Sequence, residues 1–276
     1  MFEKLVIFDY SGTLSLDAVR FAEDDNLTEE LARSGLAGLG IADTETFWAE
    51  IVNPTWQEGS TTSVGYREVI FRSIREVFSP EASDEVIRLS AARFVDSYLT
   101  HSPVDARWRS ILQKLNSEAS VVTVIATDHY AEATDYIVGF LKEMGIGAIS
   151  LKDMSGATAF PKFVVANSAD MGVHKIDQGF WEMVRDVLVL DTVQSSLIID
   201  DFGFNEEAGD SYADRRKVED RKNKTIGLLE GIFNVPVYAI PFMLKRDDQT
   251  GKSGKEEKTR GDSIMRTSLE IEQWLK

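Results

Sequence analysis

One stretch near the N-terminus places a carboxylate where an α/β fold binds its ligands. Residues 5–14 read LVIFDYSGTL, an apolar run that ends in Asp9 and is followed by Ser11 and Gly12. Open α/β sheets bind ligands at the carboxyl ends of their strands, and a glycine allows a sharp turn there. Asp9 would then face a ligand, although a carboxylate at a strand end can also merely cap a loop or a helix.

This stretch resembles the first motif of the haloacid dehalogenase (HAD) superfamily, an apolar strand followed by DxxGT and an apolar residue. In that family the first Asp attacks the substrate and forms a covalent ester, usually an aspartyl phosphate. The backbone carbonyl two residues later helps to bind Mg²⁺. The resemblance therefore implies that Asp9 is the nucleophile, and that Asp9 and the Ser11 carbonyl are ligands of Mg²⁺.

Two later positions match further motifs of the family. Thr127 ends the apolar run VVTVIAT, and its hydroxyl can donate a hydrogen bond to a phosphoryl oxygen without adding charge. Lys175 lies in GVHKIDQGF, where the family carries a lysine that neutralises the nucleophile and the phosphoryl group. This context favours Lys175 over Lys162 for the role, although Ile176 stands where the family usually has a proline.

An acidic pair, Asp200 and Asp201, follows the apolar run 197–199. Adjacent carboxylates repel each other unless a cation lies nearby, and Mg²⁺ prefers a few carboxylates together with water and phosphate oxygens. The resemblance makes Asp200 the better Mg²⁺ ligand and Asp201 its partner, with Asn205 or Glu206 as outer groups. Mg²⁺ is therefore the expected cofactor.

Ser11 is where the sequence departs from the family's phosphatases, which usually carry a second Asp there as general acid and base. Serine does not titrate near neutrality, and general acid–base help is worth about 10² to 10⁴ in rate. A substrate with a good leaving group, a substitute acid such as Asp128, His129 or a cap residue, or slow turnover would each account for Ser11. The expected function is Mg²⁺-dependent hydrolysis of a small phosphorylated molecule. Two alternatives stay open: a dehalogenase, which needs no metal, and a ligand-binding protein that has lost turnover.

The elements that would position these residues alternate between strands and helices. Continuous apolar runs rich in β-branched residues indicate strands that are covered on both faces, as in a parallel sheet. Helical periods occupy residues 130–144 and 180–190 between them. The predicted fold class is α/β, with a doubly wound, Rossmann-like parallel sheet. Strands are expected at residues 5–8, 121–126, 163–166, 197–199 and 235–240.

The chain divides into three predicted units. Helical periods over 64–78 and 84–99 break the alternation and predict an inserted helical cap. The charged residues 245–262 predict a flexible loop, and 263–276 a helix that docks on the core. Turn-forming residues of the cap lie at 53–54, 58–63 and 79–80. The predicted boundaries are 1–14 and 103–243 for the HAD-like core, 15–102 for the cap, and 244–276 for the loop and C-terminal helix.

The cap would also face the substrate. Its aromatic residues and glycine-flanked turns point Trp48, Trp56, Tyr66 and Arg67 toward the site, and the Arg67 guanidinium would complement an anionic substrate. Such aromatic side chains are also typical of the core of a cap. The predicted substrate-binding residues are Gly12, Arg67, Thr127 and Asp128.

Composition restricts the partners and the compartment. A net charge of -16 and a pI near 4.7 argue against nucleic acid or an anionic membrane, because the protein's own field would repel their phosphates. The absence of cysteine excludes disulfides and thiolate metal sites. No apolar run approaches the length of a membrane span. We therefore expect a cytoplasmic protein whose partner is a small phosphorylated substrate.

Overall fold

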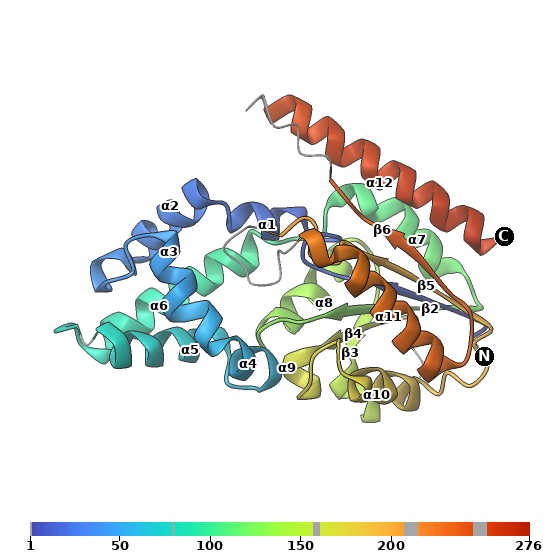
Figure 1. Cartoon of the computed structure of the whole chain (residues 1–276), viewed down its shortest axis with the longest axis horizontal. Coiled ribbons are helices and arrows are strands. Elements are labelled where there is room, and N and C mark those ends of the chain that lie inside the picture. Colours follow the sequence, from blue (N-terminus) through green and yellow to red (C-terminus); the bar gives the residue numbers. More distant parts are fainter. Residues whose placement is uncertain (1, 79, 157–160, 207–214, 245–252) are drawn as a thin grey trace.

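A parallel β-sheet forms the centre of the larger part of the molecule (Figure 1). The computed structural model describes residues 2–78, 80–156, 161–206, 215–244 and 253–276. Within these ranges six strands lie in the order β3-β4-β2-β1-β5-β6, and every neighbouring pair is parallel. The predicted α/β class with a doubly wound sheet is confirmed. The strands are β1 (Lys4–Phe8), β2 (Val121–Thr127), β3 (Ala148–Ser150), β4 (Phe163–Asn167), β5 (Ser195–Asp200) and β6 (Val237–Pro241).

Alternate residues of the central strand β1 enter two separate hydrophobic cores. Leu5 and Ile7 pack on one face of the sheet, whereas Val6 and Phe8 pack on the other. All four side chains are buried. A strand that is covered on both faces is apolar at every position, which is why a continuous apolar run predicted β1 correctly.

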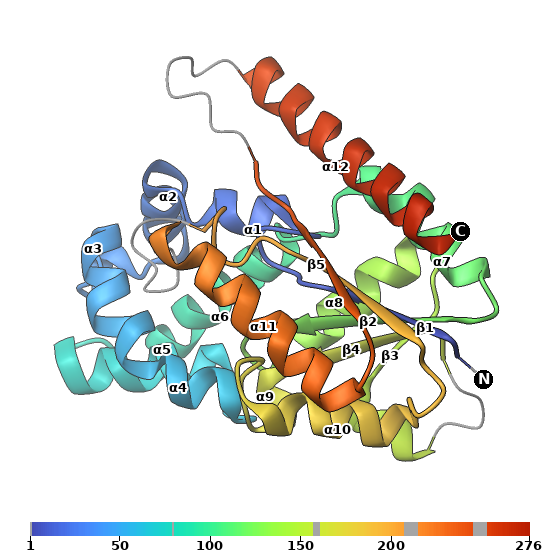
Figure 2. The same cartoon turned by 45° about the vertical axis from the view of Figure 1, so that its right-hand side comes forward.

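Helices cover both faces of the sheet (Figure 2). Helices α7 (Arg109–Ser117) and α8 (Ala133–Glu143) bury apolar side chains in the core of Val6 and Phe8, and α12 (Ser253–Leu275) packs on α7. Helices α10 (Gln178–Leu188) and α11 (Val218–Phe233) cover the opposite face. The short elements are α9 (Ser168–Met171) and the 3₁₀ turns η4 (Ala106–Trp108), η5 (Leu151–Gly156) and η6 (Arg215–Lys217). Among the helices described here, none combines the length and the apolar character needed to cross a membrane.

Between β1 and η4 the chain forms a separate group of helices, the cap, at the left of Figure 1. Its centre is apolar and aromatic, and the rings of Phe47 and Phe94 lie 5.1 Å apart there. The predicted helical insertion is confirmed, whereas the domain boundaries stay a prediction. The cap elements are α1 (Leu16–Phe21), α2 (Asp24–Ser34), η1 (Ala37–Leu39), α3 (Thr44–Thr46), η2 (Phe47–Val52), α4 (Asn53–Thr61), α5 (Tyr66–Ser73), η3 (Ile74–Phe78) and α6 (Asp84–Thr100), of which η2 and η3 are π-helical.

Several breaks in helical structure predicted from the sequence are wrong, and residues 58–61 of the predicted turn at 58–63 belong to α4 (Asn53–Thr61). Asn53 and Pro54 begin α4 instead of forming a turn, because the first turn of a helix tolerates a residue without an N–H group. Residues 253–262 belong to α12 instead of a loop. The buried guanidinium of Arg260 pairs with Asp17 at 2.9 Å and so holds this part of α12 against α1. The rest of the predicted loop, 245–252, lies outside the described residues.

Strand β3 and helix α11 are among the elements that the sequence patterns did not predict. Strand β3 has three residues at the edge of the sheet and is only partly buried, so it carries little apolar signal. Helix α11 is long but mostly polar, and it buries few side chains, among them Val218, Leu229 and Ile232. A weak periodic pattern of this kind does not distinguish a helix from a loop.

Candidate active site

The carboxyl ends of three adjacent strands form the edge of the sheet that faces the cap. Strand β1 lies between β2 and β5, and all three run in the same direction. Asp9 directly follows β1, Thr127 ends β2 and Asp200 ends β5. The backbone N–H of Asp9 donates to the carbonyl of Ile199 at 2.9 Å, which continues the ladder to the site. The topology thus brings together side chains that are far apart in the sequence.

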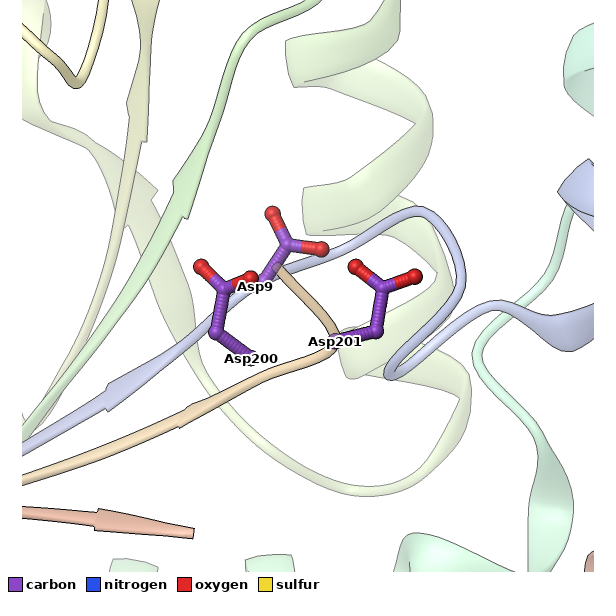
Figure 3. Close-up of side chains that lie close together, drawn as sticks. All are labelled: Asp9, Asp200 and Asp201. Carbon is purple, nitrogen blue, oxygen red and sulfur yellow. The ribbon is translucent and has the colours of Figure 1, made fainter. Parts of the chain in front are cut away.

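Three buried carboxylates, those of Asp9, Asp200 and Asp201, converge at this edge (Figure 3). One oxygen of each lies within 4.8 Å of the other two. Burial raises the pKa of Asp9 well above its usual value, against the opposing charge of Lys175. Burial, followed by the charge of Asp200, raises the pKa of Asp201 to about 7. A cluster of like charges in a buried place favours either protonation or a bound cation.

Lys175 supplies a positive charge beside the cluster. Its Nζ lies 2.5 Å from Asp9 Oδ1 and 3.5 Å from Asp200 Oδ2. The backbone holds the lysine in place, because its N–H donates to Asp128 Oδ1 at 2.9 Å and its carbonyl accepts from the Trp181 indole at 2.7 Å. Lys162, the other candidate, precedes β4 at the opposite end of the sheet, where its Nζ donates to the Asn116 carbonyl. The structure therefore brings Lys175 to Asp9, and not Lys162.

Asp201 anchors the loop that follows β5. Its Oδ1 accepts the backbone N–H of Gly203 at 2.9 Å, and its Oδ2 accepts that of Asn205 at 2.7 Å. The Asn205 amide in turn donates to the carbonyls of Gly12 at 2.7 Å and Phe242 at 2.8 Å. Asn205, predicted as an outer group of a metal site, thus ties the turn after β1 to the loop after β5.

Gly12 has a structural role in this arrangement. Its φ of +71° is in the left-handed region, and a Cβ placed on it would lie 2.7 Å from Asp201 Oδ2. Any side chain at position 12 would therefore collide with the carboxylate of Asp201 in the acidic cluster. Gly12 was predicted to bind substrate, but it is not among the described residues that line the cavity over Asp9.

The other predicted substrate contacts divide into two groups. Ser11, Thr127 and Asp128 line the cavity over Asp9, and burial raises the pKa of Asp128. Arg67 does not reach this cavity, because its guanidinium pairs with Asp96 on α6 and its side chain is 46% exposed. Among the described residues, no arginine of the cap therefore lies at the site.

His129 was a candidate for the missing general acid, and its geometry argues against that role. Its Nδ1 accepts the backbone N–H of Tyr130 at 2.9 Å, so the proton of the neutral ring is on Nε2. Nε2 lies 2.9 Å from the Tyr98 hydroxyl and donates to it. Burial lowers the pKa of His129 to about 4. At neutral pH the ring is therefore uncharged, and both of its nitrogens are engaged with protein groups.

A cavity of about 240 Å³ lies between the sheet edge and the cap. Trp48, Trp56 and Tyr66 contribute to it, in agreement with the prediction that they face the site. The sequence patterns did not identify Phe21, Phe47, Phe94, Tyr98 or Tyr130, which also line it. The pair Phe94 and Tyr98, four residues apart on α6, is the one signal that could have indicated a shared helical face.

Comparisons with solved structures give several similar chains. No protein-family model and no curated protein matches the chain. The 2-haloacid dehalogenase from Pseudomonas syringae pv. tomato DC3000 is 22% identical with a TM-score of 0.45, and the match covers 78% of this chain and 85% of that one.

Two further similar structures are HAD-like hydrolases. A predicted HAD-like family hydrolase from Porphyromonas gingivalis is 14% identical, has a TM-score of 0.44, and is matched over 94% of this chain and 98% of its own. YfnB of Bacillus subtilis, assigned as a HAD-hydrolase and crystallised bound to magnesium, is 16% identical with a TM-score of 0.40, over 87% and 95% of the two chains. Solved structures of HAD-like hydrolases are thus similar to this chain over most of its length.

Proposed function

We propose that this protein is a Mg²⁺-dependent hydrolase that transfers the phosphoryl group of a small molecule first to Asp9 and then to water. The observation that carries the proposal is the contact of Lys175 Nζ with Asp9 Oδ1 at 2.5 Å, inside a buried cluster of carboxylates. The ammonium favours the ionised form of Asp9, which burial alone would suppress. A buried carboxylate paired with an ammonium group is suited to nucleophilic attack in its ionised form.

The residues at the sheet edge fit Mg²⁺. All candidate ligands are oxygen atoms, which Mg²⁺ requires, and cysteine is absent. Asp9, Asp200 and the Ser11 carbonyl would hold the ion, while Asp201, whose two oxygens accept backbone N–H groups, supports the loop beside it. When bound, the ion would offset the carboxylate charge and polarise a phosphoryl oxygen.

The chain's own residues account for the two chemical steps. The Asp9 carboxylate attacks phosphorus, the bond to the leaving oxygen breaks, and an aspartyl phosphate forms. Lys175 neutralises charge next to Asp9, and the Thr127 hydroxyl, which lines the cavity, can donate to a phosphoryl oxygen. Water then attacks the same phosphorus, which releases inorganic phosphate and restores the Asp9 carboxylate.

The proton for the leaving oxygen has no dedicated donor at position 11, because Ser11 does not titrate near neutrality. Asp128 is the carboxyl group best placed to substitute, since it lines the cavity and burial raises its pKa. Its Oδ1, however, accepts the backbone N–H of Lys175. We therefore expect the enzyme to prefer leaving groups that depart as anions.

A dehalogenase is the second candidate, and one observation favours it. The cavity wall opposite Asp9 is largely apolar, and displacement of halide by Asp9 would need neither a second Asp nor a metal. The cluster of Asp200 and Asp201 beside Asp9 argues against this candidate, because a metal-independent reaction has no use for two more buried carboxylates.

A rate comparison with and without Mg²⁺ tests the proposal. Release of inorganic phosphate from phenyl phosphate, and of halide from 2-chloropropionate, would be followed before and after exhaustive chelation. The proposal predicts phosphate release that stops on chelation and returns with Mg²⁺, and no halide release. Halide release that survives chelation would establish the dehalogenase instead.

A further inference from the structure

The cavity above Asp9 is walled by aromatic rings from both the cap and the core. The rings come from α1, η2, α4, α5 and α6 of the cap and from the segment that follows β2. Leu27 and Val52 add aliphatic surface. A ligand group in this space would therefore meet carbon atoms on most sides. The aromatic residues that line the cavity, here called the aromatic wall, are Phe21, Phe47, Trp48, Trp56, Tyr66, Phe94, Tyr98 and Tyr130.

The aromatic wall is organised before any ligand binds. Tyr66 of α5 stacks on Tyr130 of the core with ring centroids 3.7 Å apart. Trp56 of α4 meets the same Tyr130 ring edge-on at 5.5 Å. On the other side Phe21 packs against Tyr98 at 5.2 Å. Because these rings support one another, an apolar ligand group gains contact area at a small cost in side-chain ordering.

The charges of the cavity exclude a second anionic group on the ligand. Lys175 is the residue with a positive charge at neutral pH among the described residues that line the cavity, and it already pairs with Asp9. The nearby carboxylates include those of Asp128 and Glu206. A carboxylate or second phosphate on the ligand would be desolvated next to like charges, without a cationic partner.

The cavity has room for about one ring beside the phosphoryl group. Its volume is about 240 Å³. A dry cavity of roughly 150 Å³ is large enough for benzene. The remaining space suits a phosphoryl group over Asp9.

Resting on the function proposed above, we infer that the substrate is the phosphate monoester of an uncharged phenol, with the phosphoryl group at Asp9 and the ring against the aromatic wall. A phenolate leaves without a proton donor far more readily than an alkoxide does, which matches Ser11 at the position of the usual acid. Asp9 attacks phosphorus, the bond between phosphorus and the phenolic oxygen breaks, and the electron pair leaves with the phenolate. The shape of the cavity and the missing acid thus favour the same class of substrate.

A binding comparison tests the inference without requiring turnover. Benzylphosphonate and methylphosphonate, which cannot be hydrolysed, would be titrated calorimetrically into the full-length protein with Mg²⁺ present. Burial of the ring predicts affinity about 10- to 100-fold tighter for benzylphosphonate. Equal affinities would overturn the inference.

Variants locate the ring in the aromatic wall. Trp48 is partly buried and lines the cavity, so Trp48→Ala should cut the preference for benzylphosphonate by about tenfold. Trp274→Ala is the matched control, because Trp274 lies on α12 beneath Lys4, away from the cavity, and should leave the preference unchanged. Asn53 lines the cavity but is exposed. The native protein should reject 4-carboxybenzylphosphonate, and Asn53→Lys should allow it to bind. An unchanged preference in Trp48→Ala would contradict this placement of the ring.

Turnover separates failure of the inference from failure of the proposed function. The value of kcat/KM for phenyl phosphate should exceed that for a hexose phosphate, a nucleoside monophosphate and phosphocholine. Faster hydrolysis of any of these three would overturn the substrate class while leaving the hydrolase in place. If no ester is hydrolysed but benzylphosphonate still binds more tightly than methylphosphonate, the ligand class stands and the hydrolase is wrong.

Discussion

The sheet edge and the aromatic wall face each other across one cavity and are built in opposite ways. The sheet edge concentrates charge, with Asp9, Asp200 and Asp201 around Lys175, and backbone hydrogen bonds hold these groups. The aromatic wall is held by ring packing among the cap helices and between the cap and Tyr130 of the core. Backbone hydrogen bonds at the strand ends hold the reacting groups in fixed positions. The side chains of the aromatic wall can be replaced without moving the nucleophile. The two sides should therefore respond differently to substitution.

The largest effect is expected at Asp9, where substitution should remove turnover and leave ligand binding in place. Asp9→Asn should lower phenyl phosphate hydrolysis by at least about 10⁴-fold, because a carboxamide is a far weaker nucleophile than a carboxylate. Affinity for benzylphosphonate should persist, since the aromatic wall is intact. Steady-state rates and calorimetry measure both quantities, and Asp153→Asn, at an exposed position, is the control. Near-native turnover in Asp9→Asn would refute the covalent mechanism.

A gain of function is expected at Ser11. A carboxylic acid at this position would sit beside the leaving oxygen, so Ser11→Asp should raise hydrolysis of alkyl phosphates by about 10² to 10⁴. The native enzyme should show a steep dependence of rate on leaving-group pKa, and Ser11→Asp should flatten it. A flat dependence in the native enzyme would instead indicate another acid, with Asp128 the first residue to test.

Mg²⁺ should stabilise the fold more strongly at pH 8 than at pH 5. The pKa of Asp201 is raised to about 7 from 3.8, so without metal its contribution to stability is present below pH 4 and is lost as the pH rises toward 7. Bound Mg²⁺ would offset that loss. The pKa of His129 is lowered to about 4 from 6.5, so His129 adds stability as the pH rises between those two values. It does so with and without Mg²⁺, and its contribution therefore cancels when the two conditions are compared. Thermal unfolding with and without Mg²⁺ measures this, and a difference independent of pH would argue against the metal site.

A smaller effect is expected at Gly12, which lies next to Asp201 of the acidic cluster. Gly12→Ala should destabilise the protein by about 2 kcal/mol, because of its left-handed φ and because the new Cβ would collide with Asp201 Oδ2. Mg²⁺ affinity should fall with it. In Gly139→Ala, on α8, the new Cβ meets no atom within 4 Å, and the helix should be slightly more stable. Equal behaviour of the two variants in urea unfolding would contradict this account of Gly12.

The smallest effect is expected from Arg67. Its exposed ion pair with Asp96 is worth at most about 1 kcal/mol, and Arg67 does not line the cavity. Arg67→Ala should therefore leave KM for phenyl phosphate within about twofold. A large rise in KM would show that Arg67 reaches the substrate after all.

Sequence patterns predicted the sheet edge far better than the aromatic wall. Parallel strands buried on both faces are apolar at every position, so β1, β2 and β5 stand out, and Asp9, Thr127 and Asp200 lie at or just after their ends. The inner face of a cap helix, in contrast, depends on how helices pack against one another.

Tyr66 and Arg67 illustrate the limit. They are neighbours on α5 and point about 100° apart, which helical geometry requires. Both were predicted to face the site, yet Tyr66 stacks on Tyr130 while Arg67 pairs with Asp96. No local pattern distinguishes the two orientations, because the direction of α5 relative to the core decides them.

The account depends most directly on a phosphoryl group attached to Asp9. The native enzyme turning over phenyl phosphate with Mg²⁺ would be quenched in acid, digested, and its N-terminal peptide sequenced by mass spectrometry. The account predicts a phosphoryl group on Asp9, present during turnover and absent after chelation. Sustained phosphate release with unmodified Asp9, or with the phosphoryl group on another residue, would contradict it.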